Sequence, residues 1–251
     1  VLGSATDESL VLDYVPLTPW LLKPNPYNRG TPFENMPWRE TFLGGLANSS
    51  GIETLQDYYS VPVATMTIRM YYNRDLWREL LGDRPPPTSF EEFLQVCEEV
   101  RERSKVLGKS ISPMAGSRFT ANVLMLPLFR SQTQRLWQDL NPMKDLAPPP
   151  PNFLNFLPGL ATLEDPEIRN GLSMMRDIGK YLQEGFLQLD RDDAILMFGQ
   201  GRALMLPTGV WDYGSVIEQS RFPIGFFQLP FPTPESPVYG KSVLGPISEG
   251  V

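Results

Sequence analysis

The sequence predicts an α/β protein, because segments with helical periodicity alternate with short apolar segments rich in strand-forming residues. Three segments have helical spacing: 89–107, 165–184 and 191–200. Three segments have the composition of strands: 65–72, 202–208 and 222–231. We expect one sheet that contains strands near 67–72, 203–207 and 223–229, with the first two helices packed on it.

The first helix has a clear beginning and a clear end. Ser89 stands three residues before Glu92, which is the spacing of a capping box. Apolar side chains then recur at helical intervals at Phe90, Phe93, Leu94, Cys97 and Val100. Gly108 follows this pattern and is expected to end the helix.

The second and third helices also begin at a capping residue. Asp165 precedes Pro166, and proline is favoured at the first helical position. Gly185 is expected to end this second helix. Asp190 can cap the third helix, which is expected to stop at Gly201.

The strand segments lie before and after these helices. The run "TMTIRMYY" alternates weakly, which places Tyr71 and Tyr72 on opposite faces of the sheet. The run "FPIGFFQLPF" has prolines near its ends, where they disturb a strand least.

A large aromatic residue, Trp211, follows the strand at 202–208 in the run "TGVWDYG". Gly209 permits a tight turn there, and Asp212 is favourable in the first turn of the next helix. Ligands of open α/β sheets bind beside the C-terminal ends of strands. Two interpretations remain open: Trp211 lines a ligand site, or it closes the end of a core.

Composition excludes several kinds of function. The 251 residues carry a net charge of −7, and an acidic surface repels nucleic acid. The chain has no histidine, which excludes serine–histidine triads and histidine zinc sites. Its single cysteine, Cys97, lies at an apolar helical position and is expected to be buried and inert. No cofactor, metal site or catalytic residue is predicted, and no apolar run is long enough to span a bilayer.

Two proline-rich runs, 83–90 and 146–158, have two interpretations. Such runs can be ligands of proline-binding domains. Each run also lies beside the start of a helix, where prolines form a stiff connector, and this second interpretation is the stronger one.

Five parts of the chain, in order, match one known family. They are "VLDYVPLTPWL", "MYYNRDLWRELLGDRPPPTSFEEFLQVCEEV", "LEDPEIRNGLSMMRDIGKYLQEGFL", "FGQGRALMLPTGVWDYG", and "FPIGFFQLPFP" with "YGKSVLGPISEG". Together they resemble the extracellular solute-binding proteins of ABC importers, in the carbohydrate-binding group. Residues 130–163 have no evident match. Family chains are longer, so the resemblance implies a piece of a longer protein, without the first strands of lobe one and the final helices.

The resemblance implies a two-lobed α/β fold of the type II periplasmic-binding-protein kind. Residues 1–64 would form a partial lobe one, residues 65–242 a nearly complete lobe two, and residues 243–251 a return crossing to lobe one. The two crossings, near 65–67 and 243–245, would act as hinges.

The implied function is solute binding, not catalysis. The chain would bind a sugar or oligosaccharide in an interlobe cleft, in the periplasm or outside the cell, free or on a lipid anchor. It would deliver this solute, as a monomer, to the membrane permease subunits of an ABC importer. Trp211 would stack on a sugar ring, whose C–H face is apolar. Ligand contacts are expected from Trp211, Asp212, Arg118, Phe119, Thr65, Thr67 and Ser4.

Two other functions stay open. A carbohydrate-active enzyme such as a glycosidase would need two carboxylates that flank the scissile bond. Asp212 is the one acid at an expected strand end, and the sequence shows no partner for it. A protein-binding module would instead use the proline-rich runs.

Overall fold

The computed structural model describes residues 7–42, 46, 51–52, 55, 57–61, 66–140, 159 and 161–240. The chain divides into two compact units. Unit 1 is Val1–Thr65 with Gly250–Val251, and unit 2 is Met66–Glu249. The assignment of these units to lobe one and lobe two stays a prediction.

Unit 1 consists of short elements. They are α1 (Asp7–Asp13), α2 (Thr18–Leu21), the 3₁₀ turns η1 (Pro26–Asn28) and η2 (Trp38–Thr41), and the antiparallel pair β1 (Gly51–Ile52) and β2 (Asp57–Tyr58). The start of α2 is tied to β2, because Thr18 donates its hydroxyl to the Asp57 carboxylate. The Leu17 N–H also donates to the Tyr58 carbonyl at 2.6 Å.

Unit 2 is built on a four-stranded sheet with the order β4-β5-β3-β6. The strands are β3 (Ile68–Asn73), β4 (Ser112–Met114), β5 (Ala203–Gly209) and β6 (Ile224–Phe227). β3 is antiparallel to β5 and β6, and β4 is parallel to β5. The prediction that three strands share one sheet is confirmed. The short strand β4 was not predicted.

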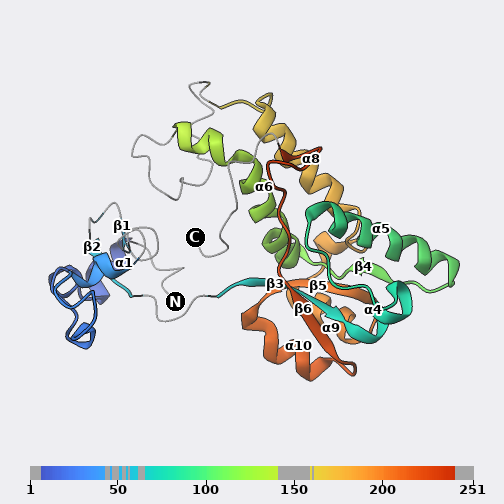
Figure 1. The fold of residues 1–251 in the computed structure, drawn as a ribbon, viewed down its shortest axis with the longest axis horizontal. Coiled ribbons are helices and arrows are strands. Elements are labelled where there is room, and N and C mark those ends of the chain that lie inside the picture. Colours follow the sequence, from blue (N-terminus) through green and yellow to red (C-terminus); the bar gives the residue numbers. More distant parts are fainter. Residues whose placement is uncertain are drawn as a thin grey trace. The chain divides into compact units, whose positions relative to one another are not determined.

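Helices cover both faces of this sheet (Figure 1). One face packs on α4 (Arg74–Leu81), α5 (Phe90–Val106), α6 (Arg118–Leu140) and α8 (Pro166–Gly179). The other face packs on α9 (Arg191–Gly199) and α10 (Tyr213–Gln219). Tyr71 belongs to the core under α9 and α10, and Tyr72 packs against the other core. The expected alternation of these two tyrosines is therefore confirmed.

The beginning of α5 follows the sequence prediction closely. The Ser89 hydroxyl accepts from the Glu92 N–H at 3.2 Å, and the Glu92 carboxylate accepts from the Ser89 N–H. These hydrogen bonds satisfy backbone donors that the first helical turn leaves without partners. Further along α5, Cys97 is fully buried, and burial raises the pKa of its thiol well above the usual range.

We expect Ser89→Ala to lower the free energy of unfolding of unit 2 by about 1 kcal/mol, the usual effect of losing a helix cap. Urea denaturation followed by circular dichroism measures this change. Ser110→Ala is the control, because Ser110 is exposed in the loop after α5. Equal midpoints for the two variants would contradict the assignment of the cap.

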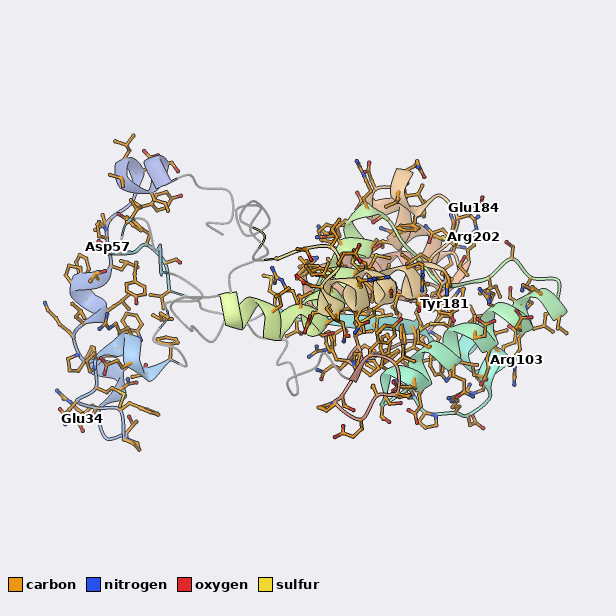
Figure 2. The ribbon with its side chains drawn as sticks, turned by 90° about the horizontal axis from the view of Figure 1, so that it is seen from above. Glu34, Asp57, Arg103, Tyr181, Glu184 and Arg202 are labelled. Carbon is orange, nitrogen blue, oxygen red and sulfur yellow. The ribbon has the colours of Figure 1, made fainter. Side chains whose placement is uncertain are left out.

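The predicted end of the second helix is wrong. α8 stops at Gly179 rather than near Gly185, because the chain then runs beside β4. Leu182 forms an isolated parallel bridge with Met114, and its side chain enters the core. Tyr181, labelled in Figure 2, donates its hydroxyl to Glu98 of α5 at 3.2 Å.

α6 is the longest helix of the described residues, and it was not predicted from the sequence. It contains Pro127 in its interior. Three consecutive polar residues, Ser131, Gln132 and Thr133, are fully buried in it, so apolar residues alone do not mark its buried face. Across the parts of the chain that the structure describes, no helix, α6 included, has the length and apolar character needed to cross a membrane.

Candidate functional site

Several chain segments meet at one edge of the sheet of unit 2. β5 ends there and continues into the 3₁₀ turn η5 (Val210–Asp212), which leads to α10. β4 runs parallel to β5, so the start of α6 lies at the same edge. α9 returns into β5 through a short turn, so its first residue also lies there. This edge is the usual ligand side of an open α/β sheet.

Trp211 lies at this edge as a partly exposed side chain. Its relative exposure is 39%, so the side chain is not buried in the core. The indole lies against Gly209, where any side chain would overlap the ring. A side chain at Gly209 would therefore obstruct this turn, as expected, and the group that it would meet is the indole itself.

Phe119, the second residue of α6, is Trp211's aromatic neighbour. The two ring centroids are 6.3 Å apart and the ring planes meet at 76°, which is an edge-to-face arrangement. Phe119 is 37% exposed, close to the value for Trp211. Two large rings from different elements therefore form one partly exposed aromatic surface.

Asp212 is buried directly beside this surface, with 2% of its area exposed. Arg191, the first residue of α9, binds both carboxylate oxygens, with its Nε 3.0 Å from Oδ2 and its Nη2 on Oδ1. The Thr208 hydroxyl also donates to Oδ2. The carboxylate makes no capping hydrogen bond to the start of α10. Its partners are Arg191 and Thr208 instead.

Arg191 joins the acid to the aromatic surface. Its guanidinium carbon lies 5.0 Å from the centre of the Phe119 ring, within the range of a cation–π contact. The hydrogen bonds to Asp212 raise the pKa of Arg191, so its charge is retained. We call Phe119, Arg191, Trp211 and Asp212 the Trp211 cluster.

Sequence reasoning missed Arg191. One signal was available: a cation in the first turn of a helix is unfavourable to the helix dipole. Arg191 occupies that position in the run "LDRDD". A residue that breaks a local rule without a local gain often has a functional reason.

The other predicted site residues have different positions. Arg118 begins α6 and its Nη2 is 3.3 Å from an oxygen of Asp190, with 70% of the arginine side chain exposed. The Thr67 carbonyl accepts from the Val210 N–H at 3.0 Å, which ties the start of β3 to η5. Ser4 and Thr65 lie outside the described residues, as do residues 243–245 of the second predicted hinge.

A hollow of about 430 Å³ lies on the α10 side of the same edge. It is lined by Thr67, Arg69, Tyr71, Val210, Tyr213 and Phe226. Burial raises the pKa of Tyr71, and the negative charge of Asp212 raises it further. Val210, which lines the hollow, is the chain neighbour of Trp211, so the hollow adjoins the Trp211 cluster.

A second hollow, of about 470 Å³, is formed by the first proline-rich run and the end of β6. Pro86 and Pro87 line it together with the segment 227–233. These prolines thus connect α4 to α5 as expected. The second run, 146–158, lies outside the described residues.

The described residues also contain no group of three or more potential metal ligands.

Several solved structures share this fold with the chain. A chitin oligosaccharide binding protein has a TM-score of 0.56 at 19% identity, covering 88% of this chain and 48% of that one. A structure from work on xylan utilization by the thermophilic bacterium Caldanaerobius polysaccharolyticus gives 0.51 at 18%, covering 87% and 48%. The solute-binding protein RafE in complex with raffinose gives 0.50 at 22%, covering 86% and 51%. The chain thus spans about half the length of these structures, and the predicted fold is confirmed.

The sequence itself carries the family signature. No curated protein matches the chain. Residues 39–247, which include every element of unit 2, match the family described as bacterial extracellular solute-binding protein. The resemblance noted from five separate runs is thereby confirmed, and the chain belongs to the family of bacterial extracellular solute-binding proteins.

Proposed function

We propose that the chain binds a sugar or oligosaccharide at the Trp211 cluster, outside the cytoplasm, and that it delivers this solute to an ABC import permease. One observation carries the proposal: two partly exposed aromatic rings stand beside a guanidinium that a buried carboxylate holds in place. Membership in the extracellular solute-binding family and the sugar-binding neighbours of the same fold support it.

This arrangement suits the two kinds of surface on a sugar ring. The C–H face is apolar and is attracted to the negative face of an aromatic ring, which Trp211 supplies. The hydroxyl rim needs a few placed polar groups. Arg191 has five N–H donors and directs two of its nitrogens to Asp212, so its remaining donors can serve the hydroxyls. Arg118 and Thr67, near the same edge, are further candidates.

Asp212 needs a different role from the one expected. Its carboxylate is almost fully buried and already accepts from Arg191 and Thr208. We therefore assign the direct hydroxyl contact to Arg191 and the support of that contact to Asp212. This pairing also weakens the glycosidase alternative, because both carboxylate oxygens are buried and already accept hydrogen bonds from the protein.

Capture would be completed by closure of a second lobe over the solute. A ligand that contacts both lobes binds the closed state better and increases its population. The crossing at Thr65–Thr67 would act as one hinge, because hinges are short segments that absorb dihedral change. The radius of gyration from small-angle scattering should then fall at saturating solute, whereas an unchanged value would leave only a static site.

A fluorescence titration tests the proposed function. Chitin oligosaccharides, raffinose and xylo-oligosaccharides are added one by one, and at least one should quench tryptophan emission in a saturable way. Trp211→Phe is the control and should lose most of the quenching. Release of new reducing ends would indicate an enzyme instead, and no response to any sugar would contradict the proposal.

A further inference from the structure

We infer that Arg191 is a positioning residue, which fixes the aromatic surface of the Trp211 cluster before any ligand arrives. The consequence for ligand affinity rests on the proposed function, whereas the positioning itself does not. Contacts among the four residues of the Trp211 cluster form a circuit that begins and ends at Asp212. Asp212 holds Arg191, Arg191 covers Phe119, Phe119 contacts Trp211, and Trp211 precedes Asp212.

The first step of the circuit is a rigid anchor. A guanidinium that meets both oxygens of a carboxylate is fixed in plane as well as in position. Asp212 is itself immobilised, because it is buried and also accepts from Thr208, the residue four positions before it. Lysine could supply the charge at this position but not the planar two-point contact.

In the second step, the fixed guanidinium restricts the motion of the two aromatic rings. Phe119 and Trp211 are each more than a third exposed, so core packing alone does not hold them. The Arg191 guanidinium lies over Phe119, and the Phe119 ring meets the indole edge to face. Gly209 supports the indole from the side of the strand. Removal of Arg191 would therefore release both rings, although it touches only one of them.

Ordered rings bind a ligand better than mobile ones, because less side-chain freedom is lost on binding. Ordering both aromatic side chains in advance corresponds to roughly a tenfold gain in affinity. A direct hydrogen bond from Arg191 to a sugar would also raise affinity. The two effects differ in one respect: only positioning changes the protein when no ligand is present.

The experiment compares Arg191→Met, Arg191→Lys and Arg202→Met in the ligand-free chain. Arg202, labelled in Figure 2, is the matched control, because it is an exposed arginine that follows the C-terminal end of α9. The near-ultraviolet circular dichroism and emission of Trp211 are obtained by subtracting the spectra of Trp211→Phe variants. We expect Arg191→Met to weaken the Trp211 dichroism and shift its emission to the red, Arg191→Lys to have a partial effect, and Arg202→Met to have none.

An unchanged Trp211 spectrum in Arg191→Met would overturn the inference, even if the affinity for sugar fell. Should Arg191→Met not fold, Asp212→Asn tests the same circuit with a side chain of the same shape, and it should give the same spectral change. Affinity is measured separately, with an expected loss of at least about tenfold for Arg191→Met, because this variant also lacks the direct hydrogen bond to the sugar. A wild-type chain that binds no sugar would contradict the proposed function and leave the spectral result to decide the positioning.

Discussion

Trp211→Ala should lower the affinity for sugar by a factor of about 30 or more, while the fold stays intact. A central aromatic contact typically contributes at least about 2 kcal/mol to binding, which corresponds to this factor. The cost in folding should be smaller, about 1–2 kcal/mol, because the indole is 39% exposed and a fully buried tryptophan costs about 3–5 kcal/mol. Calorimetric titration measures the affinity, and urea denaturation measures the free energy of unfolding.

Trp77 provides the contrast for this prediction. It is a residue of α4, and its side chain is buried in the core with 4% of its area exposed. Its indole N–H donates to the Arg84 carbonyl at 2.8 Å. Trp77→Phe should therefore lower stability more than Trp211→Phe does, and it should leave the affinity for sugar nearly unchanged. If Trp211→Ala instead lost several kcal/mol of stability, the residue would belong to the core and the site would be wrongly placed.

Gly209→Ala should lower the affinity for sugar about tenfold without removing any group that contacts the ligand. The backbone at Gly209 has φ −86° and ψ 166°, which alanine adopts without strain. Its new methyl group would occupy the space of the indole, so the Trp211 ring must move away from Phe119. The same displacement should change the near-ultraviolet dichroism of Trp211 in the ligand-free protein. The affinity is measured separately by titration with sugar.

Gly214→Ala is the matched control for that substitution. A methyl group at Gly214 meets open space, and the residue lies within α10, where alanine is the better helix former by about 1 kcal/mol. This variant should keep the affinity and slightly raise the free energy of unfolding. Equal affinities for the two variants would show that the position of the indole is not important for binding.

Patterns within short windows predicted much of unit 2. The capping box at Ser89, the strand at β5 and the place of Trp211 after it all depend on neighbours within a few residues. These short patterns did not place Phe119 near the site. Only the family resemblance did. Local signals thus located the edge of the sheet but not what lies opposite Trp211.

Features that depend on distant partners were missed. Arg191 precedes Asp212 by 21 residues, and only the return of α9 into β5 brings them together. α8 ends early because Leu182 pairs with Met114, which is 68 positions before it in the sequence. α6 was hidden because its buried face includes polar residues such as Gln132. No periodicity in one segment contains this information.

The order of strands in unit 2 also has a consequence for how the protein is made. β3 is the first strand of its sheet to be synthesised, and it lies between β5 and β6. Its residue Met70 pairs with Pro207, which is 137 positions later. At translation rates of about 5–20 residues per second, Met70 waits roughly 7–27 s for its partner in β5 and longer for its partner in β6, Phe227. Such non-local pairing also folds slowly, so we expect the sheet of unit 2 to form only after β5 and β6 have been synthesised.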